Sequence, residues 1–335
     1  MPRNLSGLSM GDAGERAVVK KILGLLKPCP GQALPTGDDA AAVQLGGGRV
    51  VVVKADMLVG ATDVPPGMTP RQVGRKAVTM NFSDLGAKGV QPTGIMISLG
   101  LPRSYLVGDA LSLMRGVSVE AERFGACVVG GDTGESGDLI VSGMAFGFAE
   151  ESNLVRRSGA SVGDALAVTG QFGLTGAGLK LLLGRERADA KIRRRLVAAV
   201  CEPRARVFEG VALGKSKCLS SSIDSSDGLA WAMHELARSS KVGFRVEDIP
   251  IPREVLRFAD ENRLDPLDLA LYGGEEYELV VTVKHGLWDA AQKAIKQAGG
   301  ILYKIGEATR ERHVTLKTEG GRVRKIEPKG YEHFK

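Results

Sequence analysis

Hydrophobic and polar positions along this chain follow two different periods, which predicts a mixture of helices and strands. Apolar residues recur at helical spacing in residues 14–26, 106–124 and 188–200. Thr69 and Pro70 are typical of a helix start, with an N-cap followed by proline at the first helical position, and open a predicted helix through Lys88. Short apolar runs and one alternating stretch predict strands at residues 50–53, 94–99, 126–129, 139–149, 165–169, 219–223, 242–246 and 277–283.

The chain of 335 residues is long enough for two domains with separate cores. A polar stretch at residues 150–163 separates two regions in which helical and strand patterns alternate. Further helices are predicted after the glycine-rich turn that follows residue 169, through Leu183, and at residues 204–213, 228–239 and 288–298, followed by a β-rich tail. We therefore predict an α+β (mixed α/β) chain in two lobes, residues 1–150 and 151–335.

Composition and charge narrow the class of protein. A content of 43% hydrophobic and 25% charged residues is that of an ordinary globular protein, and no apolar stretch reaches the 18 residues of a membrane span. The net charge of +6 suits an anionic small molecule as well as nucleic acid, and only 5% of residues are aromatic, which disfavours a base-stacking platform. We expect a cytoplasmic protein that binds neither membrane nor nucleic acid.

Cysteine and histidine supply no recognisable site. The four cysteines are widely separated and form no CxxC pair, so we expect buried, unpaired thiols. The four histidines form no metal-ligand spacing.

Two glycine motifs imitate phosphate-binding loops. Residues 210–216, GVALGKS, have three residues between the glycines where a P-loop needs four, and they continue a helical pattern, so a helix end capped by Gly214 is favoured. Residues 170–176 read GxxGxxG rather than GxGxxG, which favours a packing turn over a dinucleotide site.

Aspartates carry the strongest signal. Seven of them lie in short clusters rich in glycine and serine: Asp38, Asp39, Asp56, Asp84, Asp132, Asp224 and Asp227. Most clusters adjoin an apolar run, so strand ends are expected to bring the carboxylates to one rim of a sheet. Two carboxylates about 4 Å apart repel by roughly 4 kcal/mol at an effective dielectric of 20. Their convergence would require cations, and Mg²⁺ prefers such oxygen ligands.

A single aspartate in such a cluster is as readily explained by a local role as by a metal. Asp38, Asp84 and Asp227 each fit the N-cap of a following helix. For the whole set, the capping explanation is weak.

The ordered motifs resemble those of the thiamine-monophosphate kinase family, within the superfamily of aminoimidazole ribonucleotide synthetase (PurM-like). The corresponding segments are residues 37–39 (GDD), 54–56 (KAD), 81–84 (NFSD), 130–133 (GGDT), 157–160 (RSGA), 224–228 (DSSDG) and 273–279 (GGEEYEL), followed by 330–334 (GYEHF). The resemblance spans nearly the whole chain.

This resemblance implies a fold, a reaction and a set of roles. It implies ATP- and Mg²⁺-dependent phosphorylation of thiamine monophosphate to thiamine diphosphate by a homodimer whose N-terminal sheets pair into a barrel. It implies that the metal ligands are Asp39, Asp56, Asp84, Asp132, Asp224 and Asp227. It implies nucleotide contacts from Gly131, Asp132, Arg157 and Ser226, and substrate contacts from Asp63, Glu275 and Tyr331.

The chemistry of the implied substrate agrees with these roles. A cationic thiazolium ring favours carboxylates such as Asp63 and Glu275 and an aromatic face such as Tyr331. Its phosphate is already nucleophilic, so direct in-line transfer needs no catalytic side chain and no phosphoenzyme.

One departure separates this chain from the family pattern. Lys54-Ala55 stands where the family shows a hydroxyl pair before Asp56, so the number of metal ions is open, and Lys54 either neutralises charge or points away. Two alternatives remain: another ATP-dependent enzyme of the aminoimidazole ribonucleotide synthetase type, and a non-catalytic basic protein that retains the fold. Negative potential from the acidic clusters disfavours the second if it were to bind nucleic acid.

Overall fold

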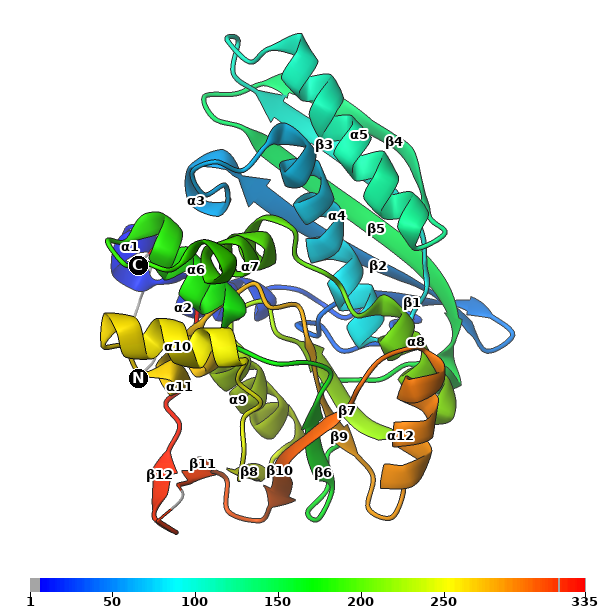
Figure 1. Ribbon diagram of the computed structural model, residues 1–335. Coiled ribbons are helices and arrows are strands. Elements are labelled where there is room, and N and C mark those ends of the chain that lie inside the picture. Colours follow the sequence, from blue (N-terminus) through cyan, green and yellow to red (C-terminus); the bar gives the residue numbers. More distant parts are fainter. Residues whose placement is uncertain (1–6, 319, 335) are drawn as a thin grey trace.

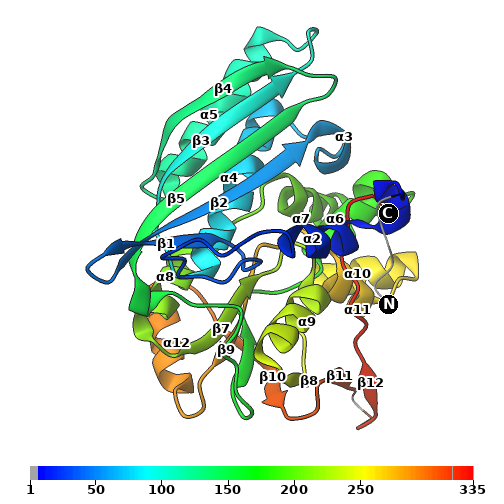
Figure 2. The ribbon, with the colours of Figure 1, turned by 180° about the vertical axis from the view of Figure 1, so that it is seen from behind.

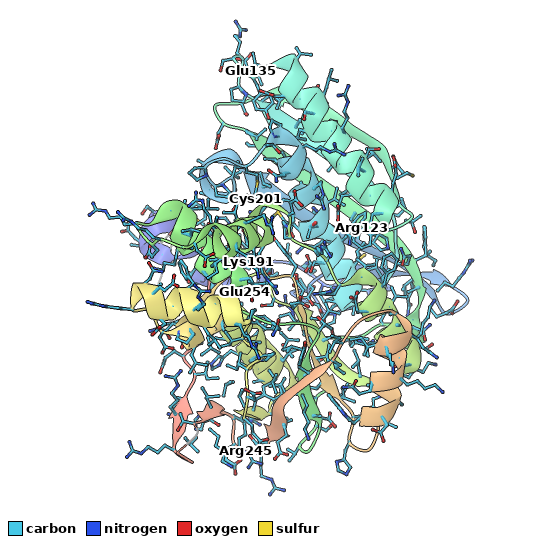
Figure 3. The ribbon with its side chains drawn as sticks, viewed as in Figure 1. Arg123, Glu135, Lys191, Cys201, Arg245 and Glu254 are labelled. Carbon is cyan, nitrogen blue, oxygen red and sulfur yellow. The ribbon has the colours of Figure 1, made fainter. Side chains whose placement is uncertain are left out.

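A computed structural model describes residues 7–318 and 320–334 of the chain. Two β-sheets form two lobes, and helix α4 lies between them (Figure 1). Glu135 on the first sheet and Arg245 on the second lie at opposite ends of the molecule (Figure 3). This arrangement confirms the mixed α/β class.

The first sheet has the strand order β1-β2-β5-β3-β4. Only β3 and β4 pair in parallel; the other neighbours are antiparallel. The strands are β1 (Ala41–Gly46), β2 (Arg49–Val59), β3 (Pro92–Leu101), β4 (Cys127–Glu135) and β5 (Ile140–Glu150). Helices α4 (Pro70–Ala87) and α5 (Val107–Arg123) pack on one face. The core of this lobe, which includes Phe82, Val52 and Ile97, lies between that face and the helices.

The opposite face of the first sheet is covered by no described helix (Figure 2). Large apolar side chains are exposed there: Met57, Met96, Val129, Met144 and Phe148. Side chains alternate across a strand, so the same strands bury Val52, Ile97 and Val141 on the other face. Contiguous exposed apolar side chains of this kind mark an interaction surface.

The second sheet has the strand order β12-β11-β8-β10-β6-β9-β7. Its strands are β6 (Ala165–Val168), β7 (Leu219–Asp224), β8 (Gly243–Val246), β9 (Leu279–Val283), β10 (Tyr303–Thr309), β11 (Val314–Lys317) and β12 (Val323–Lys325). Two clusters of buried side chains pack against it, one containing Leu236 of α9 and the other containing Leu213 of α8 and Ile295 of α12. The sheet is therefore buried between helices, which explains why all five residues of β9 are apolar or threonine and buried.

The remaining helices complete this lobe and the N-terminal segment. They are α1 (Met10–Ala13), α2 (Glu15–Leu23), α3 (Gly60–Asp63), α6 (Leu174–Leu183), α7 (Ala190–Cys201), α8 (Val207–Ser216), α9 (Leu229–Ser240), α10 (Arg253–Asn262), α11 (Pro266–Tyr272) and α12 (Trp288–Gln297), with a 3-10 turn at Glu151–Asn153. Helices α6, α7, α10 and α11 share a small core around Phe258 and Leu196. No helix of the described ranges combines the length and apolar character needed to cross a bilayer.

Most predicted elements are confirmed, but the sequence placed several of the aspartates wrongly. Asp56 and Asp132 lie within strands β2 and β4 rather than after them, because both strands continue for three residues further. Asp84 lies inside α4 and caps no helix. Strand β1 and helices α10 and α11 were not predicted.

The two glycine motifs have structural roles. Residues 210–216 belong to α8, but the left-handed C-cap is Lys217 rather than Gly214. A Cβ at Gly176 would lie 2.5 Å from the Leu269 carbonyl oxygen, so that turn is a close-packing contact between α6 and α11, as expected. The prediction of buried thiols holds for Cys201 and Cys218 and is wrong for Cys29 and Cys127, which are exposed.

Candidate active site

Helix α4 carries the polar side chains at the centre of the molecule. Thr69 and Gln72 form a capping box that fixes its start. Glycines set its distance from α5: a Cβ at Gly74 would lie 2.0 Å from the Leu113 carbonyl oxygen, and one at Gly116 would lie 2.0 Å from that of Arg71. The helix is consequently held firmly. Lys76, Ser83 and the C-cap Lys88 contact the second lobe, whereas Asn81 faces the first sheet.

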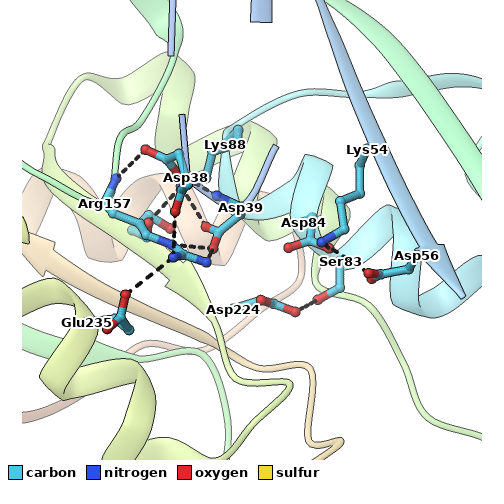
Figure 4. Close-up of polar contacts among 12 residues, drawn as sticks. Asp38, Asp39, Lys54, Asp56, Ser83, Asp84, Lys88, Arg157, Asp224 and Glu235 are labelled. Atoms are coloured by element: carbon cyan, nitrogen blue, oxygen red, sulfur yellow. Dashed lines mark hydrogen bonds and ion pairs between the residues drawn. The ribbon is translucent and has the colours of Figure 1, made fainter. Parts of the chain in front are cut away.

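Three aspartates from three elements converge beside α4. Asp39 lies before β1, Asp84 lies on α4 and Asp224 ends β7, and one carboxylate oxygen of each lies within 4.8 Å of the others. Ser83 Oγ donates a 2.7 Å hydrogen bond to Asp224 Oδ2, which ties the second lobe to α4 (Figure 4). Strand and helix from different lobes therefore build this group jointly.

Lys54 points into the acidic group from β2. Its Nζ lies 2.9 Å from Asp84 Oδ2 and 3.2 Å from Asp56 Oδ1 (Figure 4). Asp56 is held in place from α4, since Asn81 Oδ1 accepts a 3.0 Å hydrogen bond from the Asp56 backbone N–H. Of the two orientations that the sequence left open for Lys54, the structure shows the charge-neutralising one.

A second set of charges adjoins the first and is balanced. Lys88 Nζ lies 2.7 Å from Asp38 Oδ1 and 2.7 Å from Asp39 Oδ2, and its side chain is fully buried. Arg157 contacts Asp39 with its guanidinium group and donates its backbone N–H to Asp38 Oδ2 at 3.1 Å. Glu235 accepts a further contact from Arg157 at 3.5 Å. Two cations thus compensate the two aspartates.

The pKa values of the carboxyl groups in the two sets are shifted in opposite directions. Burial alone would raise the pKa of Asp39, but Arg157 and Lys88 together lower it. Burial, reinforced by the charge of Asp39, raises the pKa of Asp224 to about 7. Burial likewise raises the pKa of Asp84 well above its usual range, with Lys54 opposing and Asp224 adding to the shift. Asp84 and Asp224 therefore lack enough neighbouring positive charge.

A cavity of about 280 Å³ opens beside the acidic group. Its lining includes most residues assigned from the sequence: Asp56, Asp63, Asp84, Arg157, Asp224, Ser226, Asp227, Glu275 and Tyr331. Asp39 is not part of this lining but lies beside Asp84 and Asp224, which are. This volume is near the lower limit of small-molecule sites. Side chains of six motifs far apart in sequence thus meet at one place.

The end of the cavity away from Asp39 is built around Glu275. Lys76 Nζ lies 2.5 Å from Glu275 Oε1 and donates a 2.7 Å hydrogen bond to the Asp63 carbonyl oxygen. Glu275 Oε2 is buried and has no hydrogen-bond partner among the residues of the described ranges. Burial, partly offset by Lys76, raises the pKa of Glu275.

Strained backbone holds this end of the cavity in shape. Glu275 and Tyr277 have φ values of 64° and 53°, in the left-handed region that such side chains rarely adopt. Their backbone N–H groups donate to the carbonyl oxygens of Ser226 and Ser225 at 2.6 and 3.2 Å. The GGEEYEL and DSSDG motifs are therefore bonded to each other. Strain maintained by surrounding contacts is typical of functional sites.

Gly131 and Asp132 lie apart from the other assigned residues. Gly131 is in register with Asp56 across β3 and β5, which corresponds to three strand spacings, or about 14 Å. Asp132 pairs with Ser98 and is exposed, and its Oδ1 accepts a 2.8 Å hydrogen bond from the Thr133 N–H. Within one chain, the structure does not bring Asp132 to the cavity.

Several residues of the site were not found from the sequence. Lys76, Lys88, Glu15 and Trp231 line or support the cavity. Lys88 had a usable signal, because it follows Asp84 by four residues and so lies on the same helix face. Glu15 and Trp231 belong to a contact between α2 and α9, where the Arg16 guanidinium lies 3.4 Å from the Trp231 ring centroid, and nothing in the local sequence indicates it.

The donor set fits Mg²⁺. Asp39, Asp84 and Asp224 offer carboxylate oxygens close enough to share one ion, and hard oxygen ligands are those that Mg²⁺ prefers. Burial and, to a smaller extent, neighbouring carboxylates raise the pKa values of Asp84 and Asp224, so a bound cation would favour their ionised forms.

Comparison with known proteins identifies the family. The chain matches the models for AIR synthase related protein, N-terminal domain (residues 37–149) and C-terminal domain (residues 161–319). It is 35% identical over 304 residues to the thiamine-monophosphate kinase of Pyrococcus horikoshii, covering 89% of this chain and 91% of that protein. The corresponding protein of Nitrosopumilus maritimus is 32% identical over 285 residues, covering 85% and 89%. The chain belongs to the thiamine-monophosphate kinase family.

A solved member of this family has the same architecture. The structure described as AaThiL complexed with AMPPCP and TMP superposes with a TM-score of 0.85 at 28% sequence identity, covering 97% of this chain and 99% of that chain. Both sheets and the intervening helix α4 therefore belong to the shared thiamine-monophosphate kinase fold.

Proposed function

We propose that the protein transfers the γ-phosphoryl group of ATP to thiamine monophosphate, forming thiamine diphosphate, with Mg²⁺ as cofactor. The convergence of Asp39, Asp84 and Asp224 at one cavity carries this proposal. The names of the relatives and the AMPPCP and TMP of the AaThiL complex support it.

Metal and nucleotide are assigned to the acidic end of the cavity. Mg²⁺ would be held by Asp39, Asp56, Asp84, Asp224 and Asp227, where it would neutralise phosphate charge. Arg157 and Ser226 line the same end and are assigned to the nucleotide. Arg157 already lies against Asp39, so it is positioned to bind a phosphate beside a metal ligand.

Thiamine monophosphate is assigned to the end formed by Asp63, Glu275 and Tyr331. The buried, unpaired Glu275 Oε2 provides negative charge for the thiazolium cation, and the Tyr331 ring provides an aromatic surface. This assignment leaves the substrate phosphate directed toward the acidic end.

Alignment of the two phosphates accounts for catalysis without a protein nucleophile. The substrate phosphate is itself the attacking group, so no side chain has to remove a proton from it at neutral pH. Two lobes joined through Ser83 and Asp224 hold the donor and acceptor sites in a fixed relation. Transfer is consequently direct and in line.

The assembly that we propose is a homodimer in which the first sheets of two copies pair into a barrel. The exposed apolar face that carries Met57, Met96 and Met144 supports it, because a second copy would cover these side chains. Asp132 is in register with Ser98 of this face, so it and Gly131 are assigned to the dimer-facing side of the nucleotide site. We assign residues 1–150 to nucleotide binding and dimerisation and residues 151–335 to the C-terminal domain.

ADP formation from ATP and thiamine monophosphate tests the proposal. Wild-type protein should release ADP only when both thiamine monophosphate and Mg²⁺ are present, and Asp84→Asn should lose at least 100-fold in rate, which corresponds to about 2.7 kcal/mol. A wild type without turnover would leave a binding protein that retains the fold, whereas an Asp84→Asn variant with unchanged turnover would exclude Asp84 as a ligand that the reaction needs.

A further inference from the structure

Lys54 brings a permanent cation into the acidic group. On β2, residues two apart face the same side, so Lys54 and Asp56 extend together toward α4. The Lys54 ammonium lies 2.9 Å from Asp84 Oδ2 and 3.2 Å from Asp56 Oδ1, and only 20% of its side chain is exposed. It therefore bridges carboxylates of a strand and a helix, as an ion between them would.

The remaining charges of the site are easily apportioned. Lys88 and Arg157 compensate Asp38 and Asp39. When ionised, Asp56, Asp84 and Asp224 carry three negative charges, and Lys54 is the cation that contacts two of them, Asp56 and Asp84, within the described part of the chain. Two negative charges remain, which equal the charge of one divalent ion.

We propose that the Lys54 ammonium takes the place of one divalent ion in the nucleotide site. In the wild type, Lys54 holds Asp56 and Asp84 together, and the oxygens of Asp39, Asp84 and Asp224 that lie closest together take a metal ion. Without the Lys54 charge, Asp56 and Asp84 become free to hold another ion. The inference rests on the proposed function only in taking ATP as the nucleotide.

Counting bound Mn²⁺ by electron paramagnetic resonance, with saturating AMPPCP, tests this role. Lys54→Met removes the charge and keeps the length of the side chain, Lys54→Gln removes it with a polar end, and Lys54→Arg retains it. Both charge-removing variants should bind one more Mn²⁺ per chain than the wild type, whereas Lys54→Arg should bind the same number. Lys54→Gln decides the question if Lys54→Met does not fold.

Two results would overturn the proposal. One is the same Mn²⁺ number in the wild type and in the charge-removing variants. The other is weaker AMPPCP binding at an unchanged Mn²⁺ number, which would make Lys54 a phosphate contact instead. The Mn²⁺ count requires no turnover, so absence of kinase activity in the wild type would refute the proposed function without affecting this result.

Discussion

Two neighbouring acidic groups in this protein differ in how completely their charge is compensated. Asp38 and Asp39 are matched by Lys88 and Arg157, and the pKa of Asp39 is lowered against the effect of burial. Among the described residues, Lys54 is the one cation that contacts the group of Asp56, Asp84 and Asp224, and burial raises the pKa of Asp224 to about 7. We conclude that protein cations neutralise the first group, from which Asp39 also offers an oxygen to the metal position, whereas the second group is arranged to receive an additional cation.

This difference resolves an ambiguity that buried carboxylates always present. Buried charges are tolerated when they are paired, so burial alone does not distinguish a structural aspartate from a metal ligand. The number of cations in contact shows here which carboxylates lack compensating charge, namely Asp84 and Asp224, while Asp39 is compensated and still lies beside them. The three lysines of the site differ in the same way. Lys88 belongs to the group whose charges are balanced, and Lys54 belongs to the group whose charges are only partly balanced. Lys76 lies at the substrate end, beside Glu275.

Removing Lys88 should have the largest effect on stability. Lys88→Met leaves Asp38 and Asp39 buried with one cation between them, so we expect the free energy of unfolding to fall by about 3–5 kcal/mol in urea denaturation. Added Mg²⁺ should not restore the loss. Lys54→Met is the matched control: its loss should be smaller and should be reversed by Mg²⁺. Equal losses in the two variants would contradict the distinction between the groups.

Mg²⁺ should stabilise the wild type through the partly compensated group. At a concentration of 100 times its Kd, a ligand that binds only the folded state raises the free energy of unfolding by about 2.7 kcal/mol. Asp224→Asn should lose this gain, while Asp38→Asn, on the balanced side, should keep it. Melting temperatures with EDTA and with Mg²⁺ measure the gain, and an Asp224→Asn variant stabilised as much as the wild type would exclude Asp224 as a ligand.

The sequence predicted the chemistry of this site better than its geometry. The acidic motifs and the capped start of α4 follow from local patterns, so the helix and most of the strands were predicted correctly. Convergence of Asp84 with Asp224 depends on how the two lobes pack across α4, which no local pattern encodes. For the same reason the partners of Lys54 and Lys76 were not predictable. The place of Lys88 in the site could have been predicted, because helical spacing puts it on the same face as Asp84.

The topology of the first sheet explains why Asp132 lies far from the other assigned residues. Asp132 lies on β4, at the edge of the sheet opposite to β1, and shares a cross-strand row with the outward-facing Ser98. Strand order and the register shift between Ile95 and Met96 decide this placement, and neither is visible in the GGDT motif. A predicted role for Asp132 therefore depends on the assembly and not on the single chain.

A substitution at the substrate end of the cavity should have the smallest effect of those predicted, and it should be confined to the binding of one substrate. Glu275 holds Lys76 through Oε1, while Oε2 is free of hydrogen bonds within the described residues. Glu275→Gln keeps the shape but leaves the buried Lys76 ammonium without its counter-charge, which would repel a thiazolium cation. We expect the KM for thiamine monophosphate to rise about tenfold, or about 1.4 kcal/mol, with the KM for ATP unchanged.

A matched glutamate separates this effect from a general loss of charge. Glu235 contacts Arg157 at the nucleotide end, so Glu235→Gln should leave the KM for thiamine monophosphate unchanged. If Glu275→Gln raised both KM values equally, Glu275 would act on the shape of the whole cavity through its contact with Ser226. A selective increase would instead place the cation of the substrate at Glu275, because only there does a buried carboxylate oxygen of the cavity lining lack a partner among the described residues.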